Sequence, residues 1–141
     1  MNVETAPLPA PPRPEPGPET APYWDGLRAH ELRVQRCMQC QTLRHYPRPL
    51  CSQCYSFEHD WQTLSGNGRL LSWTVCHHPF HPGFKQRVPY TMVTVDMAEG
   101  VRMQAPLHAP LDTPLAAGLA LRLAFDDVDD TLTLPCFEIT G

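Results

Sequence analysis

The sequence predicts a mainly β fold, in which a short N-terminal helix precedes a small four-cysteine module and a five-stranded barrel. Three observations support this fold class. Two C-x2-C pairs stand between residues 37 and 54 of the 141-residue chain. Five runs rich in Val, Thr, Leu, Phe and Trp follow them, separated by turn residues. Eight of the 17 prolines fall in the first 22 residues, so most of this segment cannot form a helix or the interior of a sheet.

Composition and charge exclude several classes of protein. A hydrophobic fraction of 42% is enough for a packed core and too high for a wholly disordered chain. No window approaches the roughly 20 apolar residues of a membrane span, and the N-terminus lacks the pattern of a secretory signal. We therefore expect a cytoplasmic protein with reduced thiols and no membrane partner. The net charge of −4 and the single lysine, Lys85, argue against nucleic acid as a partner.

Residues 1–21 form a proline-rich tail. They show no apolar periodicity, and proline stands at nearly every second position in the second half of the segment. We expect a polyproline-like or disordered conformation. A solubilising leader is the favoured interpretation, and a proline-rich docking ligand is the alternative.

A short amphipathic helix is predicted over residues 21–29. Thr20 can cap it, and a proline at position 22 suits its first turn. Tyr23, Trp24 and Leu27 then share one face at helical spacing. This face either covers a small core or meets a partner protein, and the sequence leaves the choice open.

The cysteine motif is the strongest signal in the chain. Cys37, Cys40, Cys51 and Cys54 form C-x2-C-x10-C-x2-C, with short extended pieces before, between and after the two pairs. Four thiolates at the corners of a tetrahedron suit Zn²⁺ and leave no open position, so we expect a structural zinc site. Two disulfides and a bound iron are the alternatives. The position after each second cysteine often needs glycine for a positive φ, but Gln41 and Tyr55 stand there, which predicts some strain.

Residues 65–141 are predicted to form the barrel, and residues 22–64 the helix and the ribbon. A two-glycine turn at residues 65–68 marks the boundary between them. The expected strands cover residues 69–78, 90–97, 101–106, 119–125 and 132–139. Five short strands with one longer link are typical of an OB-type barrel. Four aspartates in the connection over residues 126–131 lack the spacing of a calcium loop, so we expect a solvated hairpin.

The two remaining cysteines and one long loop are the other chemically notable features. Cys76 and Cys136 are isolated within predicted strands, where a buried thiol acts as a small hydrophobic group. His77 follows Cys76 directly, but adjacent strand residues point to opposite faces, which argues against a nucleophile with its base. The loop over residues 78–89 sets two phenylalanines beside cationic groups. It either tucks under the barrel or binds an anionic, partly apolar ligand or a partner protein.

These motifs, in this order, resemble the zinc-ribbon/OB-fold family that is associated with acyl-CoA enzymes and was long described as a domain of unknown function. The resemblance covers about residues 22–139. Its motifs stand at residues 23–27, 31–37, 37–54, 61–68, 71–75, 89–91, 99–102 and 133–137. The resemblance implies a rubredoxin-like zinc ribbon, an OB fold, and a small non-catalytic partner of thiolase-like proteins or hydratases.

The leading hypothesis is an accessory subunit of a thiolase-like acyl-CoA enzyme, such as a thiolase, an acyltransferase or a steroid side-chain retro-aldolase. It would form a hetero-oligomer with that enzyme and help to form its acyl-CoA site. No catalytic residue is predicted. The candidate contacts to CoA or to the partner are Tyr23, Trp24, Leu27, Phe80, Phe84, Lys85, Arg87 and Arg102. The alternatives are a single-stranded nucleic-acid-binding ribbon/OB module and a stand-alone enzyme that uses Cys76 or Cys136.

Overall fold

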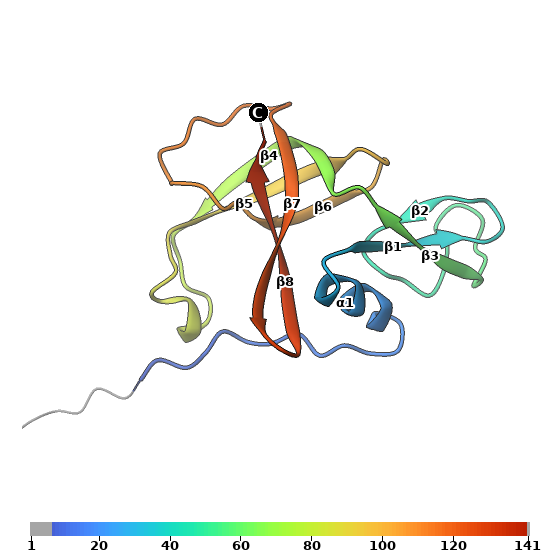
Figure 1. Cartoon of the computed structure of the whole chain (residues 1–141), viewed down its shortest axis with the longest axis horizontal. Helices are drawn as coiled ribbons and strands as arrows, with labels where there is room; N and C mark the ends of the chain where they lie inside the picture. The colour runs from blue at the N-terminus through green and yellow to red at the C-terminus, as the bar shows by residue number, and fades with distance from the viewer. Residues whose placement is uncertain (1–6, 141) are drawn as a thin grey trace, which may run out of the picture.

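A computed structural model describes residues 7–140 and confirms the predicted fold class. Within these residues the strands form two sheets, a small one of order β2-β1-β3 and a larger one of order β6-β5-β4-β7-β8 (Figure 1). The elements, in chain order, are α1 (Ala21–Arg28), β1 (Leu32–Cys37), β2 (Leu43–Arg44), β3 (His59–Leu64), β4 (Asn67–Cys76), the 3₁₀ helix η1 (Pro82–Phe84), β5 (Tyr90–Met97), β6 (Arg102–Pro106), β7 (Ala120–Asp129) and β8 (Leu132–Ile139).

The small sheet is built around β1, which pairs with β2 on one edge and with β3 on the other, both antiparallel. Its pairing with β3 runs from Leu32 opposite Leu64 to Cys37 opposite His59. Strand β1 therefore ends at Cys37, which places this cysteine at the end of the ribbon where the other three cysteines of the motif lie. The short chain between β3 and β4 then leads into the barrel (Figure 1).

The larger sheet has the strand order of an OB barrel. A single parallel bridge between Leu107 and Phe137 joins the end of β6 to β8, and His108 N donates to Phe137 O at 2.8 Å. This bridge brings the two outer strands together and partly closes the barrel. Glycine is required at position 68, where β4 packs closely on β5, because a Cβ there would lie 2.5 Å from Val95 Cγ1.

Strand β4 divides into two halves with different neighbours. Residues Asn67 to Arg69 pair with β7, whereas the pairing with β5 continues to Cys76. A bulge between Leu70 and Ser72 separates the halves, and such bulges bend a strand. The second half of β4 therefore leaves β7 and pairs, within the described residues, with β5 alone.

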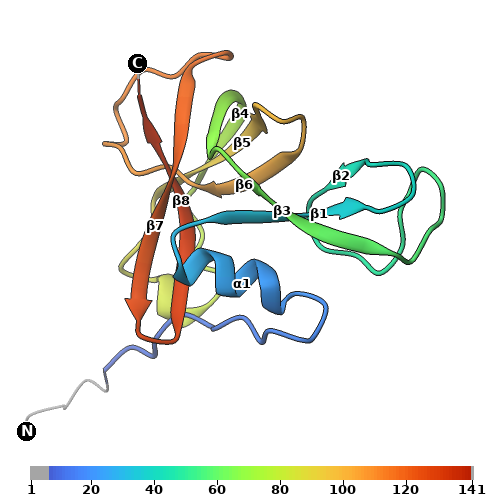
Figure 2. The same ribbon diagram turned by 45° about the vertical axis from the view of Figure 1, so that its right-hand side comes forward.

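Helix α1 lies between the ribbon and the barrel (Figure 2). Tyr23 and Leu27 are buried, at 6% and 0% exposed, in one apolar cluster that also contains Leu32 of the ribbon and Phe137 of the barrel. The helix therefore covers a shared core, which is one of the two roles that its sequence left open. Thr20 precedes the helix but does not cap it, because its hydroxyl accepts from Gly17 N at 3.1 Å instead.

The proline-rich tail lies against the barrel from residue 7 onward. The described part, up to the helix, forms no helix or strand, as the prolines predict. It is not a free segment, however: it passes the tip of the β7–β8 hairpin in both views (Figures 1 and 2), and Arg13 forms an ion pair with Asp129. Residues 1–6 of the predicted tail lie outside the described residues.

The acidic segment forms an exposed hairpin, as expected, with a shorter connection. Strand β7 extends to Asp129, so the connection shrinks to two residues, and two of the exposed aspartates have partners. Asp129 bonds to Arg13, and Asp127 bonds to Thr133 and to His30. Thr133 lies on β8 itself, whereas Arg13 comes from the tail and His30 from just after α1, and the sequence alone could not place these two near the hairpin. Between residues 7 and 140 no helix has the length and apolar character needed to cross a membrane.

Candidate metal centre and partner surface

The four cysteines of the motif come together at the end of the ribbon. Their Sγ atoms all lie within 4.8 Å of one another. The shortest separations join the two pairs, at 3.5 Å between Cys37 and Cys54 and 3.6 Å between Cys40 and Cys51. Tetrahedral ligation at about 2.3 Å per Zn–S bond needs sulfur atoms about 3.8 Å apart. The cluster therefore fits a zinc ion with four protein ligands and no open position.

Each C-x2-C pair forms a tight turn that is closed by backbone hydrogen bonds. Gln41 N donates to Cys37 O and Tyr55 N donates to Cys51 O, both at 3.0 Å. The two donor residues have φ values of 68° and 63°, the left-handed region that favours glycine. The sequence predicted this geometry from the positions of Gln41 and Tyr55 alone.

The four thiols are close enough to affect one another's protonation. Hydrogen bonds from Thr42, first from its side chain and then from its backbone, lower the pKa of Cys40 to about 6. A backbone hydrogen bond at Ser56 also favours the thiolate of Cys54, yet burial and the neighbouring thiols raise its pKa to about 12. Thiols this close cannot all lose their protons without a positive charge between them. Zn²⁺ supplies that charge in a structural site.

A buried polar network stiffens the ribbon beside the metal-binding end. Gln35 is fully buried, and its Oε1 accepts from Arg44 Nε and from Arg48 N, both at 2.7 Å. Arg44 is 8% exposed and also donates to Arg48 O at 2.9 Å. These bonds hold the segment between the two cysteine pairs against β1. A glutamine at the centre of a small sheet is a structural feature that the sequence analysis did not identify.

The structure separates the candidate contact residues into groups. Tyr23 and Leu27 are in the core, which removes them from the contacts because they have almost no surface to offer, while Trp24 is half-buried. Phe84 is half-buried, with its ring centroid 6.3 Å from that of Tyr90.

The exposed candidates stand at two separate places on the barrel. Phe80 is 87% exposed, and Lys85 and Arg87 are exposed on the same loop before β5. Arg102 pairs with Asp96 at 2.7 Å, near the opposite end of β5. The six residue-to-residue steps of β5 from Tyr90 to Asp96 put about 20 Å between Arg102 and that loop. Arg102 therefore does not belong to one site with Lys85 and Arg87.

An exposed apolar stripe lies on the second half of β4, and we call Leu71, Trp73 and Val75 the β4 stripe. Their exposed fractions are 39%, 41% and 38%. Trp73 and Val75 are two residues apart and lie opposite the buried Val93 and Thr91, so they share one face of the strand. Leu71 stands at the bulge just before them, and Phe80 follows in the next loop. The alternation is visible in the sequence, but it reads equally well as a strand with a buried face. Only the departure of β4 from β7 leaves this face uncovered.

No catalytic arrangement is found in the part of the chain that the structure describes. Cys76 lies opposite Tyr90 in the sheet and has no hydrogen-bonded histidine among these residues. Burial raises the pKa of the Cys136 thiol, with smaller contributions from Asp126 and Glu138, which is the opposite of what a nucleophilic cysteine needs. Cys136 is therefore the small buried group that the sequence predicts, whereas Cys76, at the end of β4, is only half-buried.

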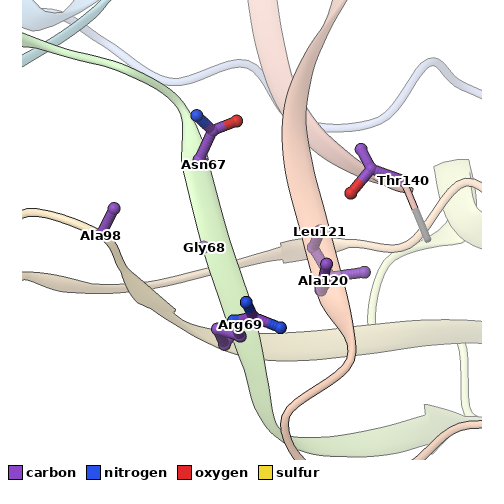
Figure 3. Close-up of a pocket in the computed structure, with 7 residues that line it drawn as sticks. All are labelled: Asn67, Gly68, Arg69, Ala98, Ala120, Leu121 and Thr140. Atoms are coloured by element: carbon purple, nitrogen blue, oxygen red, sulfur yellow. The ribbon is translucent and has the colours of Figure 1, made fainter.

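A shallow hollow lies over the paired part of β4 and β7 (Figure 3). Its volume is about 280 Å³, which is below the roughly 300–1,000 Å³ of typical ligand pockets. Arg69 is the charged residue of its lining, and it donates to Gly118 O at 3.2 Å. The rest of the lining is small, polar or aliphatic, without a pair of titratable groups. This hollow offers no acid, base or nucleophile.

Comparison with known families agrees with the two-part architecture. Residues 24–60 match the rubredoxin-like zinc ribbon domain of ChsH2, and residues 61–126 match its C-terminal OB-fold domain. The chain is 35% identical over 136 residues to a "Probable enoyl-CoA hydratase alpha subunit" of Thermomonospora curvata. It is 37% identical over 118 residues to the "3-oxo-4,17-pregnadiene-20-carboxyl-CoA hydratase alpha subunit" of Mycobacterium tuberculosis.

The solved structures include one with both sequence and fold similarity. The structure titled "Ltp2-ChsH2(DUF35) aldolase" contains a chain that superposes with a TM-score of 0.79 at 35% identity. The match covers 90% of this chain and 98% of that one. This chain belongs to the ChsH2-type zinc-ribbon/OB-fold family, also called DUF35. It matches 96% and 84% of its own length to the two hydratase subunits but spans only 42% and 37% of theirs.

Proposed function

We propose that this chain is a non-catalytic accessory subunit of a thiolase-like acyl-CoA enzyme. The observation that carries the proposal is its likeness, over nearly the whole of that chain, to the DUF35 chain in an aldolase complex. A structural metal site and the lack of a catalytic arrangement within residues 7–140 support a docking role. The names of the hydratase relatives do not contradict this role, because the chain corresponds to less than half of each.

The β4 stripe and Phe80 are the surface that we propose for docking on the enzyme. Exposed apolar side chains on a part of a strand that is paired along one edge only are costly in water, and burial in an interface removes that cost. Trp is also a residue type that often dominates interface energies. The stripe therefore places Trp73 at the centre of the proposed interface.

Lys85 and Arg87 are the residues that we propose for contact with the CoA phosphates at a shared site. They are exposed on the loop that directly follows the β4 stripe, so a partner docked on the stripe would lie close to them. Arg102 stands apart and would make a different contact. If Arg87 binds CoA, the Michaelis constant for the acyl-CoA rises in Arg87→Ala while the complex still forms.

Co-expression with a thiolase-like enzyme encoded beside this chain tests the proposal. We expect the two proteins to elute together from size exclusion and the enzyme to lose activity without its partner. Trp73→Ser should weaken the complex by more than about 2 kcal/mol, as for a central interface residue. Leu111→Ser is the matched control, because Leu111 is 52% exposed but lies outside the stripe. Separate elution with unchanged activity would contradict the proposal, and salt-sensitive binding of single-stranded DNA would favour the rival class.

A further inference from the structure

The N-terminal segment joins two loops of the barrel that are far apart in sequence. At one end, Ala10 and Pro11 pass directly over Gly83 in η1. A Cβ on Gly83 would lie 2.5 Å from Pro11 N and 2.6 Å from the Ala10 carbonyl carbon. The absence of a side chain at position 83 therefore allows the two backbones to approach, and any other residue would push the segment away.

At the other end of residues 10–13, Arg13 forms hydrogen bonds to the turn between β7 and β8. Its Nη1 donates to Asp129 Oδ2 at 2.8 Å, and its Nη2 donates to Oδ1 at 3.3 Å and to Thr131 Oγ1 at 2.9 Å. Asp129 in turn accepts from Thr131 N at 2.8 Å and from Leu132 N at 3.0 Å. The turn itself therefore holds the Asp129 carboxylate in place, which favours a bidentate interaction with the Arg13 guanidinium. Arg13 and the bonds at Thr131 hold the pKa of Asp129 well below its ordinary value.

The segment also contacts the barrel with a regular spacing. Pro11, Pro14 and Gly17 are half-buried, and the residues between them are exposed. A period of three is that of a polyproline helix lying with one edge on a surface. Such a segment is already extended before it binds, so ordering it costs little entropy.

OB folds hold extended ligands with the loop after their first strand and the loop between their fourth and fifth strands. In this barrel those loops are the one that contains η1 and the β7–β8 turn. We propose that residues 10–13 are the resident ligand of this loop pair, so that the loop pair is a binding site for an extended, proline-rich segment that carries one arginine. The site is then filled from within the chain and is not open to a nucleic-acid strand.

One relative is consistent with a segment that belongs to the domain. Residues 7–20 are 14 residues, a tenth of the 141-residue chain, so a match over 96% of the chain to the hydratase alpha subunit of Thermomonospora curvata includes most of them. The inference does not depend on the proposed function, because its contacts lie within one chain. It does bear on that function, since the η1 loop also carries Phe80, Lys85 and Arg87.

Hydrogen exchange of the full chain tests the proposal. Gly83→Ala should speed amide exchange about tenfold at residues 84–88 and at 131–132, while Gly17→Ala leaves them unchanged, because a Cβ there meets nothing within 4 Å. Arg13→Ala should speed exchange at residues 131–132 by about two- to fivefold, as expected for an exposed ion pair. Arg122→Ala, which removes another exposed pair with Glu138, is its control.

Rescue in trans distinguishes a binding site from a loss of local packing. A synthetic peptide of residues 7–17, added to the Arg13→Ala chain, should restore slow exchange at residues 131–132, and the same peptide with alanine at position 13 should not. Equal exchange in Gly83→Ala and Gly17→Ala would overturn the proposal. So would a failure of the wild-type peptide to restore protection at millimolar concentration.

Discussion

The ribbon and the barrel are stabilised in different ways. The ribbon has three strands, one of them only two residues long, and its buried residues include metal-binding cysteines and a polar pair, Gln35 and Arg44. The barrel buries apolar side chains from each of its five strands, including Leu70, Val93, Val95, Met103, Leu121 and Phe137. Metal ligation therefore replaces apolar burial where the sheet is too small to exclude water by itself.

The two regions are nevertheless joined by one core. Leu32, Val34 and Leu64 of the ribbon strands belong to the same cluster as the barrel residues, with Tyr23 and Leu27 of α1 between them. Across the outer surface, Tyr46 Oη of the ribbon accepts from Gln104 N of β6 at 3.0 Å. The metal-dependent ribbon and the apolar barrel therefore share one core. Mutations can show which strands depend on the metal and which depend on the shared apolar contacts.

Loss of the metal should have the largest effect, and it should be confined to the ribbon. Structural zinc contributes about 10–16 kcal/mol of folding free energy in small zinc modules at neutral pH. We expect Cys51→Ser to abolish stoichiometric zinc binding and to remove amide protection from β1, β2 and β3, while β4 to β8 keep most of theirs. Metal analysis and hydrogen exchange measure the two effects.

Cys76→Ser is the matched control for this variant, because Cys76 lies outside the metal-binding cluster. It should bind one zinc ion and leave the ribbon protected. If all eight strands lose protection together in Cys51→Ser, the barrel depends on the metal as well, and the distinction between the two regions is wrong.

Truncation of a helix residue should instead weaken both regions at once. Leu27 is fully buried in the shared cluster, and a Leu→Ala change at such a site costs about 2–5 kcal/mol. We expect Leu27→Ala to lower the thermal midpoint in a single transition, with the zinc content unchanged before unfolding. Calorimetry and metal analysis check this.

Leu111→Ala, on an exposed loop, should change the midpoint little. Two separate transitions in Leu27→Ala, with the barrel unfolding at its wild-type temperature, would show that α1 stabilises only the ribbon.

The local features of this fold could be predicted from the sequence. The five barrel strands, the metal ligands and the strained positions at Gln41 and Tyr55 all follow from patterns within about twenty residues. Alternation, turn residues and cysteine spacing are local signals, because each reflects the conformation of a short segment. The metal site was predictable for the same reason, since all four ligands lie within one short stretch.

The long-range features could not be predicted in the same way. Arg13 and Asp129 are 116 residues apart in the sequence, and no local pattern near either residue predicts that they form an ion pair. The β4 stripe was missed because exposure depends on a neighbouring strand that bends away, which a pattern within β4 does not reveal. Arg102 was grouped with Lys85 and Arg87 by charge alone, although the length of β5 separates them.

The smallest expected effect concerns the strain in the ribbon turns. Gln41 has a φ of 68°, and a non-glycine residue in the left-handed region costs about 1 kcal/mol relative to glycine. Gln41→Gly should therefore bind zinc about fivefold more tightly, the factor that corresponds to about 1 kcal/mol, as measured by competition with a chromogenic chelator.

Gln39→Gly is the control, because Gln39 lies in the same turn without a positive φ. Glycine at position 39 adds flexibility to the unfolded chain and should weaken zinc binding slightly. Equal shifts in the two variants would mean that the turn stores no strain at position 41. In that case the ribbon would need the metal only because its apolar core is small. Backbone strain at position 41 would not add to that need.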